Sequence, residues 1–130
     1  GGDFTFIGNQ YHLMAGSRDL YIDLLLFHRR LRSLVAIELK IGEFEAEYAG
    51  KMQLYLTALD EQVKLPDENP SIGMIICKSK DKTYVEYALK QTSAPIGVAT
   101  YQLRSTLPDN MKAMLPEPEE IAKRLRIFEQ

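Results

Sequence analysis

The sequence predicts an α/β fold in which a mixed central sheet is flanked by helices on both faces. Three strand-like segments follow one another with short links, and a helix-like segment with an apolar stripe comes next. After it, strand-like and helix-like segments alternate along the chain. An antiparallel meander that leads into strand–helix–strand units gives a sheet with antiparallel and parallel neighbours.

The meander is predicted at residues 4–13, 21–27 and 34–40. The first segment is rich in β-branched and aromatic residues, and residues 15–17 give a turn signal after it. The second segment is apolar at nearly every position, which is typical of a buried central strand. A polar connection at residues 28–32 leads into the third strand.

The rest of the chain alternates between helix and strand. A helix follows the meander, strands are predicted at residues 72–77 and 96–103, and further helices at residues 80–90 and 119–128. In the first helix, apolar residues at spacings of three and four form one stripe. The stripe comprises Phe44, Tyr48, Met52, Tyr55, Leu56 and Leu59.

Length and composition fit one ordinary globular domain. The chain has 130 residues, with 45% hydrophobic and 26% charged residues, so residues 1–130 are expected to form a single domain. Cys77 is the only cysteine, which excludes an internal disulfide and a cysteine-rich zinc site and fits the cytoplasm. No apolar run approaches the roughly 20 residues of a membrane-spanning helix.

The charge balance gives mixed evidence about nucleic acid. The net charge of −2 counts against it, because phosphate binding usually leaves a basic footprint. However, His28, Arg29, Arg30 and Arg32 cluster around one turn. Arg29 and Arg30 are therefore candidate substrate contacts, although a solvated turn explains the cluster equally well.

Charged residues interrupt two apolar strands. Asp23 lies within the second strand, and a carboxylate there costs several kcal/mol unless it is paired or binds a metal. Side chains alternate along a strand, so Glu38 and Lys40 of the third strand point to the same face. The two strands are expected to pair, which would place Asp23 beside Glu38 with Lys40 one step along.

This set of residues suits metal-assisted chemistry. Two carboxylates with backbone carbonyls and water suit Mg²⁺ or Mn²⁺, so Asp23 and Glu38 are predicted metal ligands. Lys40 could position or deprotonate an attacking water, or stabilise charge on a phosphoryl group. The alternative is a buried ion pair between acid and lysine that serves only structure.

The first helix adds further candidates. Gln53 lies at one edge of the apolar stripe and could reach a metal-bound water or a phosphate, although an ordinary surface glutamine is the alternative. Lys51 lies at the opposite edge, and Tyr55 lies within the stripe with its hydroxyl at the rim. Gln10 on the first strand could face the same cleft.

These residues resemble a known family. The order of Asp23, then Glu38-Leu39-Lys40, then a helix with Gln53 is similar to the motif of the PD-(D/E)XK nuclease superfamily. The sequence from about residue 4 to residue 101 also resembles the C-terminal domain of the bacterial YhcG-type family. The segments that carry the likeness are Phe6-Ile7-Gly8-Asn9-Gln10-Tyr11, Tyr21-Ile22-Asp23-Leu24-Leu25, Ala36-Ile37-Glu38-Leu39-Lys40-Ile41-Gly42, Tyr48-Ala49-Gly50-Lys51-Met52-Gln53-Leu54-Tyr55-Leu56 and Asn69-Pro70-Ser71-Ile72-Gly73.

The resemblance implies a restriction-endonuclease-like fold and a magnesium-dependent nuclease that hydrolyses DNA phosphodiester bonds to leave a 5′-phosphate. It implies that Asp23 and Glu38 bind the metal, that Lys40 handles the water and that Gln53 orients it. The alternative is a catalytically inactive module of the same fold, used for nucleic-acid binding or protein assembly. The acidic net charge favours that alternative, and the intact set of acids and lysine argues against it.

The resemblance also implies a DNA-processing role in bacteria and an N-terminal helical domain on the same polypeptide. The single cysteine and the lack of a long apolar run lead us to expect the cytoplasm and no membrane partner. The superfamily core begins with a helix before its first strand. Since the chain begins Gly1-Gly2 and has almost nothing before Phe4, we expect a C-terminal fragment that lacks this helix and the N-terminal domain. A homodimer is a further expectation, because sheets of this superfamily often pair.

Overall fold

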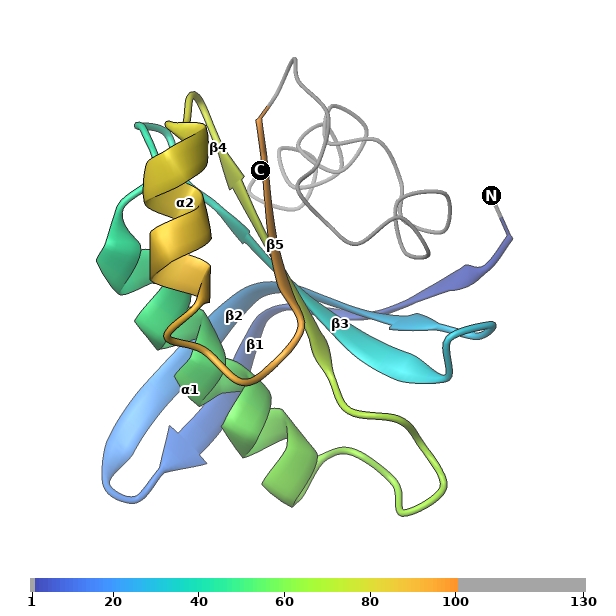
Figure 1. The fold of residues 1–130 in the computed structure, drawn as a ribbon. Coiled ribbons are helices and arrows are strands. Elements are labelled where there is room, and N and C mark those ends of the chain that lie inside the picture. The colour runs from blue at the N-terminus through green and yellow to red at the C-terminus, as the bar shows by residue number, and fades with distance from the viewer. Residues whose placement is uncertain (1, 101–130) are drawn as a thin grey trace.

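The computed structural model describes residues 2–100, which form one five-stranded sheet and two helices (Figure 1). The order along the chain is β1 (Phe4–Ala15), β2 (Arg18–His28), β3 (Ser33–Leu39), α1 (Ala46–Gln62), β4 (Ile72–Cys77), α2 (Lys82–Leu89) and β5 (Ile96–Thr100). The strands lie in sequence order across the sheet. Neighbours from β1 to β3 are antiparallel and neighbours from β3 to β5 are parallel, which confirms the predicted mixed sheet.

The first two strands are longer than the sequence predicts. Their pairing continues to Ala15 and Arg18, and Gly16 turns the chain between them with a φ of 62° that a glycine adopts without strain. The extra residues were missed because the turn signal at residues 15–17 and the polar pair Arg18 and Asp19 after it are typical of a loop. The end of the strand predicted at residues 96–103 and the helix predicted at residues 119–128 lie outside the described residues.

Both described helices pack on the same face of the sheet (Figure 1). Their buried side chains form one core with alternate residues of the strands, including Ile22, Ala36 and Val98. Gly73 on β4 lets α1 approach closely, because a Cβ at this position would lie only 2.5 Å from Cγ of Met52. This contact fixes how α1 is rotated about its axis, which matters for the site described below.

The opposite face of the sheet has its own apolar cluster. Leu24, Val35, Ile37 and Met74 are buried there, and no described helix contributes to this cluster. The prediction was that helices cover both faces of the sheet. Within residues 2–100, helices cover only one face. Neither α1 nor α2 is long and apolar enough to cross a membrane.

Candidate active site

Asp23 and Glu38 meet where the hydrogen-bond ladder between β2 and β3 ends. The last paired residues are Leu24 and Ile37. Beyond them, the backbone N–H of Asp23 donates to Oε1 of Glu38 at 3.2 Å, and the backbone N–H of Leu39 donates to Oδ2 of Asp23 at 3.0 Å. The two carboxylates thus take the place of carbonyl groups in the ladder, and the structure brings the two predicted metal ligands together.

Gln10 reaches the same carboxylate from β1. It is left out of the pairing register between Asn9 and Tyr11, and its φ of 47° lies in the left-handed region. For a residue other than glycine this backbone conformation costs on the order of 1 kcal/mol or more, so surrounding contacts must hold it. Its side-chain Nε2 donates to Oδ1 of Asp23 at 3.1 Å. The structure therefore places Gln10 beside Asp23.

Glu38 is almost completely buried, with 7% of its surface exposed, whereas Asp23 is half-buried. Burial, followed by the negative charge of Asp23, raises the pKa of Glu38 from its ordinary value of 4.5 to about 8. Lys40 acts in the opposite direction and lowers this pKa, but it is the weakest of the influences.

Lys40 stands just beyond the end of β3. Its backbone N–H donates to the carbonyl of Ile76 on β4 at 2.8 Å, so the chain keeps its strand direction through this residue. The Nζ atom lies 4.6 Å from the centre of the Tyr48 ring on α1. Tyr48 was predicted only as part of the apolar stripe. No spacing in the sequence links Tyr48 to Lys40, so this contact follows only from the packing of α1 on the sheet.

Lys51 and Tyr55 of α1 lie near the carboxylates. The Nζ atom of Lys51 is 5.6 Å from the centre of the Tyr55 ring. A hydrogen bond with Tyr55 raises the pKa of Lys51, and the charges of Glu38 and Asp23 raise it further. Burial raises the pKa of Tyr55, and so does the charge of Glu38. The charges of the acid pair thus influence the pKa values of both Lys51 and Tyr55, the two residues of α1 predicted as substrate contacts.

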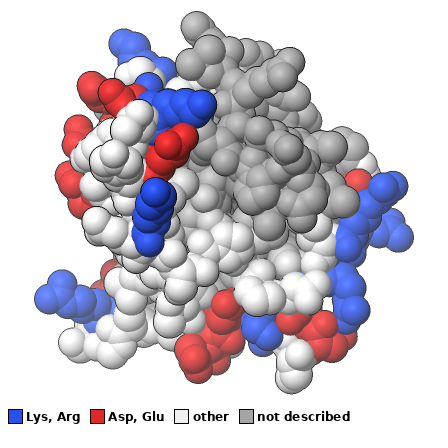
Figure 2. Space-filling model, viewed as in Figure 1, with Lys and Arg blue, Asp and Glu red and all other residues white. Residues whose placement is uncertain are grey.

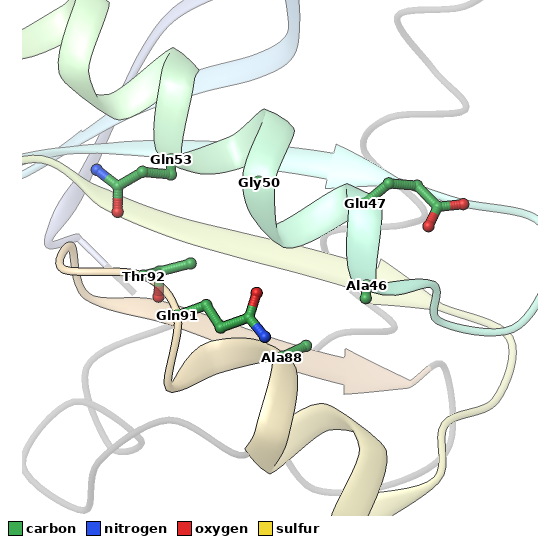
Figure 3. A pocket seen from close by; sticks show the side chains of 7 residues that line it. All are labelled: Ala46, Glu47, Gly50, Gln53, Ala88, Gln91 and Thr92. Atoms are coloured by element: carbon green, nitrogen blue, oxygen red, sulfur yellow. The ribbon is translucent and has the colours of Figure 1, made fainter.

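Gln53 lies on the other side of α1. Its Oε1 accepts hydrogen bonds from the backbone N–H groups of Ser93 at 3.0 Å and Ala94 at 2.9 Å, and its Nε2 donates to Thr57 at 3.3 Å. In Figure 3 its side chain borders a pocket of about 380 Å³ between α1 and α2. The structure therefore does not bring Gln53 to Asp23 and Glu38, and its predicted role in orienting water gains no support from this position.

The position of Gln53 gives a prediction about stability. Gln53→Ala removes the acceptor of two backbone N–H groups and should lower the free energy of unfolding by about 1–2 kcal/mol. Gln53→Glu keeps an acceptor oxygen and should lose less. The two variants are compared by urea denaturation, alongside the affinity for Mn²⁺. A loss of Mn²⁺ affinity in Gln53→Ala at unchanged stability would contradict the structural role and favour the predicted catalytic one.

The basic turn lies at the far end of the β2–β3 hairpin. Ser33 and Glu38 are five positions apart along β3, which corresponds to about 17 Å. Arg30 pairs with Asp3 at 3.1 Å and Arg32 pairs with Asp67 at 3.2 Å, while His28 is buried. On the face shown in Figure 2, several basic side chains lie together along the right edge, and acidic side chains lie directly beside them. Arg29 and Arg30 can contact a substrate only if it extends along the hairpin.

The residues present fit a hard divalent cation. Within residues 2–100 no group of three or more acids, histidines or cysteines converges, so Asp23 and Glu38 are the carboxylates available at this place. Burial and the neighbouring Asp23 raise the pKa of Glu38, and a bound cation would favour the charged form of this carboxyl. Two carboxylates with water or substrate oxygens are a common way to hold Mg²⁺ or Mn²⁺.

The raised pKa of Glu38 predicts how stability depends on pH. Between pH 4.5 and pH 8 the folded, metal-free protein keeps a proton on Glu38 that the unfolded chain has lost. The contribution of Glu38 to the free energy of unfolding is therefore greatest at the acidic end of this window and falls as the pH rises through it. The difference in melting temperature between wild type and Glu38→Gln should change steadily across this window, as measured by calorimetry in EDTA. Parallel curves would contradict the burial argument.

A family model described as the YhcG PDDEXK nuclease domain matches residues 1–116. The chain belongs to this family. A curated relative in the YhcG family, "Putative nuclease YhcG" of Escherichia coli (strain K12), is 40% identical over 112 residues, which is 86% of this chain and 29% of the relative. This YhcG domain thus spans less than a third of the length of that relative.

A solved structure supports the fold. The crystal structure of a repair endonuclease from Pyrococcus abyssi matches 75% of this YhcG domain and 37% of that chain, with a TM-score of 0.50 and 15% sequence identity. At this identity the likeness concerns the fold alone. The predicted restriction-endonuclease-like architecture is confirmed, and the chain is a nuclease-family domain.

Proposed function

We propose that this domain hydrolyses phosphodiester bonds in DNA with a divalent metal, Mg²⁺ or Mn²⁺, held by Asp23 and Glu38. The observation that supports the proposal best is the pair of carboxylates at the end of the β2–β3 ladder, one of them buried, with a lysine beyond it. Burying an acid beside another acid costs free energy that a bound cation would recover.

The residues of the chain have distinct tasks in this proposal. A bound metal supplies Lewis acidity, which polarises a phosphoryl oxygen and lowers the pKa of water. Asp23 and Glu38 hold it, and Gln10 orients the Asp23 carboxylate through its amide. Lys40, close to Glu38 and held over Tyr48, stabilises the negative charge that develops on the phosphate or directs the attacking water. The expected product carries a 5′-phosphate.

The wider context is also a proposal. We expect a bacterial cytoplasmic protein that processes DNA, in which this domain is joined to an N-terminal domain of the same polypeptide and forms a homodimer. The match to only 29% of the E. coli relative is consistent with a further domain. The alternative of an inactive nucleic-acid-binding module has less support, because the chain belongs to a nuclease family and keeps both carboxylates and the lysine of the proposed site.

The metal requirement is tested first. Full-length protein should cleave plasmid or branched DNA with Mg²⁺ or Mn²⁺ and not with EDTA. Mn²⁺ should also raise the melting temperature of the wild type by mass action and should not raise that of Asp23→Asn. Equal thermal shifts in both proteins would place the metal elsewhere, and cleavage that persists in EDTA would overturn the proposal.

A further inference from the structure

α1 presents its two edges to different parts of the molecule. Met52 packs against Gly73 on β4, and Gln53, the next residue, turns toward the loop before β5. Since successive helical residues are about 100° apart, Lys51 points to the other side of Met52, toward β3 and β2. That side of the sheet carries Glu38 and Asp23. The rotation of the helix alone therefore directs Lys51 to the acid pair.

Tyr55 holds Lys51 in this place. The tyrosine ring is buried, with 2% exposed, and the lysine ammonium lies 5.6 Å from its centre. Because this ring is packed in the core, an ammonium that it attracts has fewer orientations to lose when a ligand binds. Lys51 itself remains exposed to solvent. It is accessible to a ligand and already positioned.

Two lysines thus flank the acid pair in the same manner. Lys40 lies over Tyr48 at 4.6 Å and Lys51 lies over Tyr55 at 5.6 Å. The two tyrosines are seven residues apart on α1, which is about 10 Å along the helix axis. This spacing of the anchors is enough for the two lysines to contact different phosphates. Two neighbouring phosphates of a nucleic-acid strand would engage both.

We infer that Lys51 is a second phosphate-binding cation of the site, which contacts a phosphate next to the one that is cleaved. This inference rests on the proposed function, since Lys40 and the acid pair define the phosphate that is cleaved. The substrate is then a polynucleotide strand. The phosphate next to the cleaved bond lies near α1, where Lys51 can reach it. Lys51 contributes binding energy to the strand and no ligand to the metal.

Lys51→Met is expected to weaken the binding of DNA and to leave the binding of Mn²⁺ intact. Binding of a DNA duplex to the full-length protein is measured by fluorescence anisotropy with Ca²⁺ in place of Mg²⁺, at several salt concentrations. The slope of log K against log salt should fall by about one in Lys51→Met, as for one lost phosphate contact. The dissociation constant for Mn²⁺ should not rise, because the variant removes a positive charge close to the carboxylates. Lys51→Arg should keep the wild-type slope.

Lys90 provides a matched control. Lys90, which follows α2, is also an exposed lysine beside a tyrosine, with its Nζ atom 5.8 Å from the centre of the Tyr87 ring, although this ring is exposed. Lys90→Met therefore removes one exposed positive charge away from the acid pair and should keep the wild-type slope. An unchanged slope in Lys51→Met would overturn the inference, as would a Mn²⁺ affinity as weak as that of Asp23→Asn. If the wild type itself binds no Mn²⁺ through Asp23, it is the proposed function that fails, and the two failures remain distinct.

Discussion

Lys40→Met is expected to lower the rate of DNA cleavage by on the order of a hundredfold or more while Mn²⁺ binding persists. The lysine acts on the phosphate or the water and is not a metal ligand in the proposed mechanism. Glu38→Gln, by contrast, should lose cleavage and the thermal shift with Mn²⁺ together, since it removes a ligand. Single-turnover cleavage of a labelled duplex and thermal melts with Mn²⁺ measure the two properties separately.

The control for this experiment is Lys90→Met, which should cleave at the wild-type rate. Two outcomes would contradict the assignment of Lys40. One is cleavage by Lys40→Met at a rate near that of the wild type. The other is loss of the Mn²⁺ shift in Lys40→Met, which would mean that the lysine supports the fold of the site and has no separate chemical role.

Gly73→Ala is expected to cause the largest loss of stability. The new Cβ would lie 2.5 Å from Cγ and 2.8 Å from Sδ of Met52, and 3.2 Å from Leu56. Met52 and Leu56 are completely buried, so they cannot move aside without disturbing the core between α1 and β4. Overpacking of this kind typically costs about 1–3 kcal/mol, measured as a change in the free energy of unfolding in urea.

Gly50 supplies a control within the same helix. A Cβ there meets nothing within 4 Å, so Gly50→Ala should be neutral or should stabilise α1 by up to about 1 kcal/mol. Met52→Ala in the Gly73→Ala background should recover part of the loss, because it vacates the space that the new methyl group needs. A Gly73→Ala protein as stable as the wild type would show that α1 can shift on the sheet.

The strands and the pairing of acid with acid were accessible from the sequence because alternation along a strand is a local property. Glu38 and Lys40 share a face whatever the sheet looks like, and apolar positions on both sides of Asp23 identify a central strand. The pattern of hydrogen bonds that links Asp23 to Glu38 and Leu39 was not accessible. It depends on where the β2–β3 ladder stops, and no single residue encodes that point.

The edge of α1 that faces the site could not be chosen from the helical pattern either. Lys51 and Gln53 lie on opposite edges of the same stripe, and a helical wheel treats the two edges alike. The structure distinguishes them through the close packing of Met52 on Gly73. Charges that are neighbours in sequence were misleading for a similar reason. Arg30 and Arg32 lie at a hairpin end where acids from distant segments pair with them.

The exchange of hydrogen bonds at the end of the ladder has one more consequence. The amide groups of Asp23 and Leu39 donate to the carboxylates that are proposed to hold the metal. A cation that draws on the same oxygen lone pairs weakens both bonds at once. In an NMR spectrum these two amide resonances are therefore internal reporters of metal occupancy, and Mg²⁺, which has no spectroscopic signal of its own, becomes visible through the backbone of the sheet.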